Sequence, residues 1–127
     1  MIVPIFSCDD SLKATKFYVE ALGFNFVARY QPDENLNDPA YVTIALNDNH
    51  LHLTSFPASQ GSGKMAYVYY DDPQEVDALY ERIKNRTDLI INVPAVNQSW
   101  GIRELGITDP FGNKLTFGAD VTASPAR

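Results

Sequence analysis

Few side chains in this sequence are suited to acid–base, nucleophilic or metal chemistry, and they fall in small groups. Two carboxylate pairs occur, Asp9-Asp10 and Asp71-Asp72, and the two histidines, His50 and His52, share one segment. Each Asp pair precedes an expected helix, where a carboxylate accepts hydrogen bonds from the first backbone N–H groups, so capping is favoured over acid–base work. The sequence contains no G-x-S-x-G motif, phosphate-binding glycine loop or Cys/His pair at a family spacing.

Cys8 and His52 each allow two interpretations. Cys8 is the only cysteine, which excludes an internal disulfide framework and a multi-cysteine zinc site. It is either a nucleophile or, as we favour, a small apolar residue at the end of a strand. His52 stands among leucines in an expected strand and is either a partly buried, hydrogen-bonded residue or a residue that lines a cavity. His50 is expected to face solvent.

Composition limits the classes of partner. The chain has 127 residues, 45% hydrophobic residues and a net charge of −6. This length suits one domain or two small modules, and the apolar content suffices for a core. An acidic chain disfavours nucleic acid, whose phosphates require a basic surface. No basic, apolar leader and no run of about 20 apolar residues is present, so we expect no membrane partner and a cytoplasmic location.

The first half of the chain predicts a strand, a helix and three further strands. Residues 2–6 form an apolar run in which Pro4 indicates an edge, a kink or an exchange between chains, because proline cannot donate to a ladder. A helix is expected at residues 11–22, with Gly23 as its stop. The remaining strands are expected at residues 24–30, 41–46 and 51–56.

The second half repeats this order after a linker at residues 59–64. A strand is expected at 65–70, then a helix to about residue 85 that starts with a capping box at Asp72. A strand at 89–93 precedes a final hairpin at 100–117. In that hairpin Leu105 and Ile107 share one face of the first strand, and Leu115 and Phe117 share one face of the second. A turn at 109–113 joins the two strands.

This internal repeat predicts an α+β fold with two βαβββ modules. The first module is assigned to residues 1–58, the second to 65–118, and 119–127 to a flexible tail. Curled, mainly antiparallel sheets, with one helix outside each, are expected to enclose a groove that suits a small molecule.

Four short motifs stand out in combination: Phe17-Tyr18, Leu22-Gly23-Phe24, Trp100-Gly101-Ile102-Arg103-Glu104 and Asp109-Pro110-Phe111-Gly112-Asn113. With the repeat, they resemble the vicinal oxygen chelate superfamily, which includes glyoxalase I, extradiol dioxygenases and the fosfomycin and bleomycin resistance proteins. The resemblance covers residues 2–118. Within the superfamily, Val3-Pro4-Ile5, Gln98-Ser99-Trp100-Gly101 and Ala66-Tyr67-Val68-Tyr69 are most similar to the bleomycin resistance branch. Ile102 departs from that branch, whose best-known members have Trp-Gly-Arg-Glu without an insertion.

The resemblance implies a homodimer that binds a cationic antibiotic in grooves at the subunit interface and does not convert it. It also implies that the N-terminal strand near Pro4 is exchanged between the subunits. The chain itself leaves open whether the ligand is a bleomycin-like antibiotic or an unidentified metabolite.

The enzymes of this superfamily hold a divalent metal on His, Glu or Gln, two ligands from each module, and the resemblance places these positions at Val3, His52, Met65 and Thr116. Only His52 offers a good donor, because a metal needs imidazole nitrogen or carboxylate oxygen. We therefore expect no metal, no cofactor and no catalytic residue. The alternative is a metal-dependent glyoxalase- or dioxygenase-like enzyme of the same fold.

The favoured function is thus a non-catalytic protein that sequesters a cationic or aromatic small molecule. Trp100 and Tyr30 are the leading candidates for stacking on a flat ligand. Asp33 belongs to an acidic loop at residues 31–39, which is either a solvated surface loop or a binding loop. Arg103 is expected to pair with a carboxylate in the sheet. The complete set of expected ligand-binding residues is Trp100, Tyr30, His52, Phe56, Tyr67, Tyr69, Asp33 and Glu104.

Overall fold

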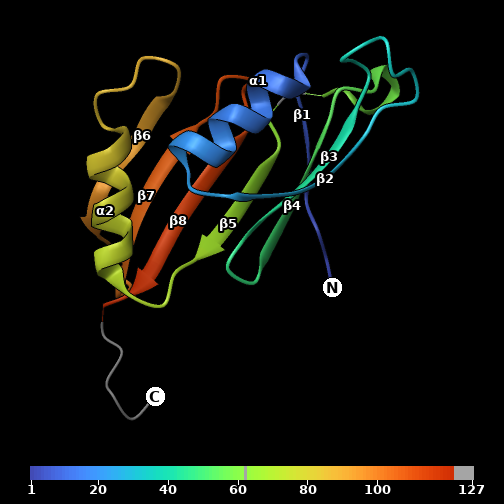
Figure 1. Ribbon diagram of the computed structural model, residues 1–127. Coiled ribbons are helices and arrows are strands. Elements are labelled where there is room, and N and C mark those ends of the chain that lie inside the picture. Colours follow the sequence, from blue (N-terminus) through green and yellow to red (C-terminus); the bar gives the residue numbers. More distant parts are fainter. Residues whose placement is uncertain (62, 122–127) are drawn as a thin grey trace. The chain divides into compact units, whose positions relative to one another are not determined.

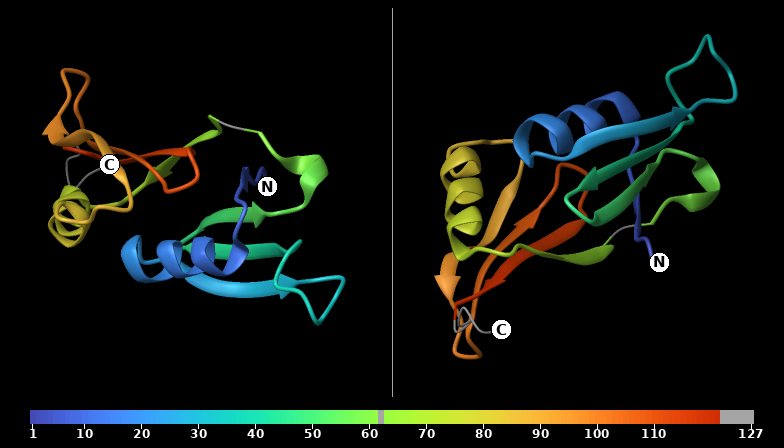
Figure 2. Two further views of the ribbon diagram at one scale, coloured as in Figure 1. Left: turned by 90° about the horizontal axis from the view of Figure 1, so that it is seen from above. Right: turned by 60° about the horizontal axis from the view of Figure 1, so that its bottom comes forward.

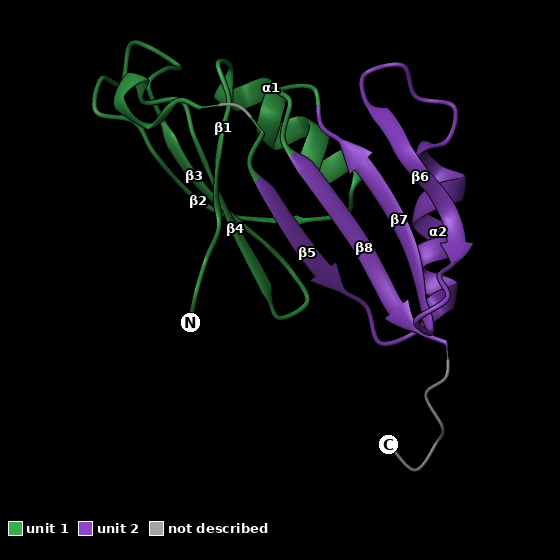
Figure 3. Ribbon diagram, turned by 180° about the vertical axis from the view of Figure 1, so that it is seen from behind, with its two compact units in different colours: residues 1–64, 110–113 green, residues 65–109, 114–127 purple. Residues whose placement is uncertain are grey.

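Each half of the chain forms a four-stranded sheet, and the two sheets have the same strand order. The computed structural model describes residues 1–61 and 63–121 (Figure 1). The chain separates into two units, the first with residues 1–64 and 110–113, the second with residues 65–109 and 114–127 (Figure 3). Both sheets are mixed and each unit carries a helix, so the predicted α+β fold is confirmed.

The first sheet has the order β1-β4-β3-β2. Strands β1 and β4 are parallel, and the other two pairs are antiparallel. A π-helical turn at Phe17–Ala21 continues the helix α1, and a short 3-10 turn at Pro57–Ser59 follows β4. The bounds are β1 Ile5–Ser7, α1 Ser11–Lys16, β2 Asn25–Tyr30, β3 Tyr41–Leu46 and β4 Asn49–Thr54.

The second sheet has the order β5-β8-β7-β6, again with one parallel pair, β5 with β8. The repeat predicted from the sequence therefore extends to strand order and direction. The bounds are β5 Met65–Tyr69, α2 Pro73–Ile83, β6 Ile90–Asn97, β7 Ile102–Thr108 and β8 Lys114–Asp120.

The Asp pairs cap helices, as expected. Asp10 accepts a hydrogen bond from the backbone N–H of Lys13 at 3.0 Å, and Asp72 accepts one from Gln74 at 2.8 Å. Asp72 also forms a capping box, since the side chain of Glu75 accepts from the Asp72 backbone N–H. These bonds satisfy N–H groups that have no partner within the helix.

Each helix packs on one face of its own sheet. Helix α1 contacts β3 and β4, and α2 contacts β6, β7 and β8 (Figure 2). In the last hairpin, Leu105, Ile107, Leu115 and Phe117 are all buried, which confirms the predicted alternation. Among residues 1–61 and 63–121, no helix of a unit covers the opposite face of its sheet, which is called the uncovered face below. None of the helices within the described part of the chain is long and apolar enough to span a membrane.

Several strand limits differ from the expected ones. Strand β1 begins at Ile5 instead of residue 2, and Pro4 contributes only its carbonyl, which accepts from the N–H of His52 at 3.1 Å. Strand β2 does not alternate, because a register shift lies between Phe26 and Ala28 and both Phe26 and Val27 are exposed.

The tail assignment was also wrong at its start. Strand β8 continues to Asp120 and Ala119 is fully buried, because residues 102 and 103 of β7 extend the pairing there. Residues 122–127 of the expected tail lie outside the described residues. Whether the two sheets enclose a groove stays a prediction.

The capping box gives a first test. Replacing Asp72→Ala removes the acceptor for the Gln74 N–H, so we expect a loss of about 1 kcal/mol in the free energy of unfolding and roughly 3 °C in Tm. Asp71→Ala is the matched control, since Asp71 is exposed and precedes the cap. Thermal unfolding followed by circular dichroism measures both. Equal losses in the two variants would contradict the capping role.

Candidate functional site

The uncovered face of the second sheet carries two rows of side chains. Strand register places residues from β5, β8, β7 and β6 side by side, and successive residues alternate between the faces of a sheet. Met65, Tyr69 and Val96 are exposed on this face although they are apolar or aromatic. The first row is Tyr67, Thr116, Gly106 and Val93. The second row is Tyr69, Gly118, Glu104 and Val96.

Tyr67 crosses from one row to the other and binds Glu104. Its hydroxyl donates to Glu104 Oε2 at 2.6 Å, a charge-assisted hydrogen bond between β5 and β7. The ring passes over Gly118 of β8, since a Cβ at residue 118 would lie 1.9 Å from the Tyr67 hydroxyl oxygen. Glycine at this position is thus required for the contact between Tyr67 and Glu104.

Tyr69 adds a second ring beside Tyr67, with 4.6 Å between the ring centroids. Burial raises the pKa of Tyr67 above its ordinary value, and the hydrogen bond and negative charge of Glu104 raise it further. Tyr67 is therefore a neutral phenol at physiological pH. The result is two neighbouring aromatic rings next to a carboxylate, an arrangement that suits flat apolar groups and cations.

Arg103, next to Glu104 in β7, points to the opposite face of the sheet. Its Nε donates to Asp77 of α2 at 2.8 Å, and its Nη1 donates to Asn97 of β6 at 2.9 Å. Arg103 pairs with a carboxylate, as expected, but this carboxylate belongs to the helix α2 and not to the sheet. Arg103 thus fixes α2 on the sheet, while Glu104 belongs to the uncovered face.

Trp100 lies in the turn between β6 and β7. A hydrogen bond of 3.1 Å from the N–H of Gly101 to the carbonyl of Gln98 closes this turn, and Gly101 has a φ of 86°, which favours glycine. The indole is 65% exposed and is the only tryptophan of the chain. It is therefore accessible to a ligand and serves as a single fluorescent reporter.

The uncovered face of the first sheet carries a second aromatic pair. The Tyr41 hydroxyl and His52 Nδ1 are hydrogen-bonded at 2.8 Å, and Tyr30 lies directly across from Tyr41 in β2. Burial, and then the neighbouring His50, lower the pKa of His52, so its imidazole is neutral at physiological pH. His52 is thus hydrogen-bonded, on a half-buried face that also holds the exposed Tyr30.

Two other expected ligand residues in the first unit take part in local structure. Asp33 accepts a hydrogen bond from the backbone N–H of Asn35 at 2.9 Å within the 31–39 loop. Phe56 is half-buried directly before the 3-10 turn, and its N–H donates to the Thr54 hydroxyl at 3.2 Å. The expected site residues therefore divide equally between the units: Tyr30, Asp33, His52 and Phe56 in the first, and Tyr67, Tyr69, Trp100 and Glu104 in the second.

The donor set does not fit a divalent metal. In the observed register His52 pairs with Ile5, two residues after the expected Val3. Thr116 pairs with Tyr67, two residues after the expected Met65. Isoleucine offers no donor atom and the Tyr67 phenol is bonded to Glu104. Within residues 1–61 and 63–121, no three His, Cys, Asp or Glu side chains are grouped closely enough to hold a metal ion.

Two residues of these faces were missing from the expected site. Tyr41 holds His52, and its position opposite Tyr30 follows only from the strand register. Gly118 has no side chain and so leaves room for the Tyr67 ring. A glycine within a strand indicates the close approach of another group, so the sequence carries a signal for this contact.

Sequence comparison with known families gives one match. A family model described as the Glyoxalase/Bleomycin resistance protein/Dioxygenase superfamily matches residues 4–117. No curated protein matches the chain in sequence.

Solved structures with similar folds include binding proteins and an enzyme. TnmS3, an antibiotic binding protein from Streptomyces sp. CB03234, is 28% identical, with a TM-score of 0.67 and coverage of 94% of this chain and 96% of that chain. A bleomycin-binding protein from Streptomyces verticillus is 24% identical (TM-score 0.62, coverage 93% and 93%). Lactoylglutathione lyase from Agrobacterium tumefaciens is 22% identical (TM-score 0.68, coverage 94% and 92%). The last two likenesses concern the fold alone.

The Tyr67–Glu104 pair predicts a specific alkaline titration. Replacing Glu104→Gln removes the negative charge while keeping the side-chain shape, so the pKa of Tyr67 should fall but stay above its ordinary value, because burial remains. Spectrophotometric titration of tyrosinate measures the change, and subtraction of the Tyr67→Phe titration isolates the step that belongs to Tyr67.

Glu20→Gln is the matched control for this titration, because Glu20 is an exposed carboxylate on the π-helical turn of the other unit. It should leave every tyrosine step unchanged. A Tyr67 step at the same pH in wild type and Glu104→Gln would refute the contact.

Proposed function

Since the chain belongs to the glyoxalase/bleomycin resistance protein/dioxygenase superfamily, we propose that it binds a small aromatic or cationic molecule and does not convert it. The ligand is a bleomycin-like antibiotic or a metabolite with similar chemistry. The residues proposed to contact it in the second unit are Tyr67, Tyr69, Trp100 and Glu104. In the first unit, Tyr30, His52, Phe56 and Asp33 are proposed as ligand-binding residues.

The observation that carries this proposal is the group formed by Tyr67, Tyr69 and Glu104. The rings lie 4.6 Å apart on a face that no helix covers, and the carboxylate is held at the Tyr67 hydroxyl. Stacking of a ligand ring contributes roughly 0.5–1.5 kcal/mol beyond the burial of area. A cation next to Glu104 and the ring faces gains a further contribution of about 0.5–1 kcal/mol at an exposed site.

The similar solved structures are compatible with this ligand class. TnmS3 is an antibiotic binding protein, and the Streptomyces verticillus protein was crystallised with copper(II)-bleomycin. The net charge of −6 favours a neutral or cationic ligand over an anionic one.

We further propose that two copies of the chain associate. Each unit exposes large apolar side chains to solvent, among them Ile2 (97% exposed) in the first unit and Met65 (71% exposed) in the second. Covering such side chains in an interface is favourable, because it removes apolar area from water. A homodimer, with the N-terminal segment around Pro4 exchanged between copies, covers such surface, and analytical ultracentrifugation should give twice the mass of one chain.

Titration with bleomycin tests the ligand class. We expect a saturable change in Trp100 fluorescence with a micromolar midpoint, and a matching heat in calorimetry. Tyr69→Ala should weaken binding by about tenfold, because it removes a ring that is 64% exposed and available for stacking. Glu104→Gln should weaken binding of the cationic drug, whereas Glu20→Gln should not.

The absence of saturation in both measurements at about 100 μM drug would exclude a bleomycin-type antibiotic as the ligand. Equal affinities of the wild type and the Glu104→Gln and Tyr69→Ala variants would place binding elsewhere on the chain.

Metal analysis of the purified protein separates a binding protein from an enzyme of the same fold. His52 is the one good donor among the four expected ligand positions, and its Nδ1 is bonded to Tyr41. We therefore expect less than stoichiometric nickel, zinc, iron or manganese after incubation with each ion and gel filtration. One equivalent of metal that is lost in a His52→Ala variant would contradict the binding-protein proposal.

A further inference from the structure

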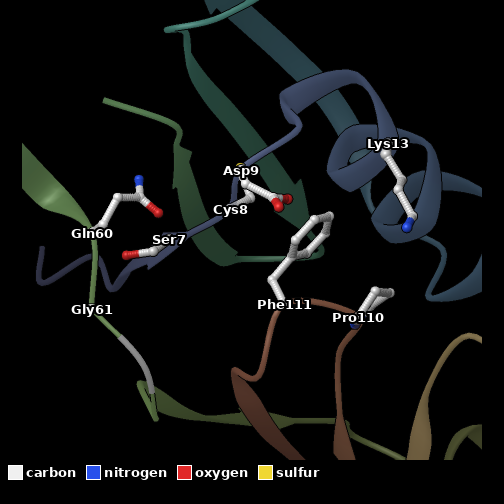
Figure 4. Close-up of a pocket in the computed structure, with 8 residues that line it drawn as sticks. All are labelled: Ser7, Cys8, Asp9, Lys13, Gln60, Gly61, Pro110 and Phe111. Carbon is white, nitrogen blue, oxygen red and sulfur yellow. The ribbon is translucent and has the colours of Figure 1, made fainter. Parts of the chain in front are cut away.

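A recess in the first unit lies where β1 ends and the chain turns into α1. It has a volume of about 590 Å³, within the range of small-molecule sites. Three segments that are distant in the sequence form its walls (Figure 4): residues 7–9 with Lys13, residues 60–61, and Pro110 with Phe111. None of these residues belongs to the site proposed above.

The walls of this recess are held by hydrogen bonds to β1. The side-chain amide of Asn113 donates to the Ser7 carbonyl at 2.9 Å, and this contact fixes the turn that carries Phe111. Lys64 Nζ donates to the Ser7 hydroxyl at 2.7 Å and to the Ser59 carbonyl at 3.0 Å. The recess is thus formed before any ligand arrives, which lowers the entropic cost of binding.

Gln60 is oriented by two contacts of its amide nitrogen. Its Nε2 donates to the carbonyls of Thr54 and Phe56, each at 3.1 Å. These bonds leave the side-chain oxygen Oε1 without a hydrogen bond from any described residue. Gln60 therefore offers a positioned acceptor at one wall of the recess.

Two opposite charges stand on either side of the Phe111 ring. Lys13 Nζ lies 5.9 Å from the ring centroid, and Figure 4 shows the Asp9 carboxylate on the other side of the ring. Among the described residues Asp9 makes no ion pair or side-chain hydrogen bond, and the contact with Phe111 is the one that holds the Lys13 ammonium. Both charges are therefore available to a ligand.

We propose that this recess binds a zwitterionic small molecule with an apolar ring, such as an amino acid with an aromatic side chain. The ammonium group of the ligand donates to Asp9 and to Gln60 Oε1, and its carboxylate pairs with Lys13. The ring packs on Phe111 and Pro110. A cation alone leaves Lys13 unpaired and an anion alone leaves Asp9 unpaired, so a ligand with both charges is preferred over either.

Ligand titrations of uniformly labelled protein by NMR test this inference. The three probes are L-phenylalanine, its amide, which carries only the ammonium, and 3-phenylpropionate, which carries only the carboxylate. Saturable shifts at Asp9, Lys13, Gln60 and Phe111 are expected with phenylalanine, which should bind at least fivefold more tightly than either analogue.

Variants of the two charged residues identify the contacts. Asp9→Asn and Lys13→Gln should each weaken phenylalanine binding by about fivefold to tenfold. Lys16→Gln is the matched control, since Lys16 is an exposed lysine on the same helix outside the recess, and it should bind like the wild type. All three substitutions replace exposed side chains, so the fold should be retained, which circular dichroism checks.

Three results would overturn the inference. The first is an absence of saturable shifts at about 10 mM phenylalanine. The second is equal affinity for phenylalanine and its amide, or unchanged affinity in both charge variants. The third is a pattern of shifts confined to Tyr67, Tyr69 and Trp100, which would assign the ligand to the sheet face of the second unit. Failure of bleomycin binding has no bearing on these measurements.

Discussion

The burial of only one face of each sheet is the constraint on which the rest of the structure depends. Outside the register shifts in β2 and β6, strand residues face the helix and the uncovered side in alternation. In β7 this separates neighbours in the sequence: Arg103 pairs with Asp77 on the helix side, Leu105 is buried there, and Glu104 lies on the other side. A one-residue slip in register would exchange all of these roles.

The uncovered faces have an organisation of their own, although they have no helix to pack against. In each unit a tyrosine hydroxyl is hydrogen-bonded to a side chain on another strand, Tyr41 to His52 and Tyr67 to Glu104. These bonds hold the rings in place, which lowers the side-chain entropy lost on binding of the proposed ligand. Repetition of the same device in both sheets argues for a common use of the two faces.

The sequence was sufficient for elements with strong local signals. The capping box at Asp72, the stop at Gly23 and the alternation of Leu105, Ile107, Leu115 and Phe117 all led to correct elements. The sequence was insufficient where the pairing between strands determines the register and the limits of a strand. Strand β2 has a register shift that no local pattern announces, and β8 extends through Ala119 because β7 provides a partner. For the same reason, the position of Tyr41 opposite Tyr30 became visible only with the register.

The turn at residues 110–113 has a consequence for the order in which the chain acquires structure. It belongs to the first unit, while the strands on either side of it belong to the second. The bond from Asn113 to Ser7 spans 106 residues. During synthesis on the ribosome the first unit therefore remains incomplete until nearly the whole chain has emerged, although its own sheet ends at residue 54. Contacts of such long range slow folding, and they make the two halves interdependent despite their repeated architecture.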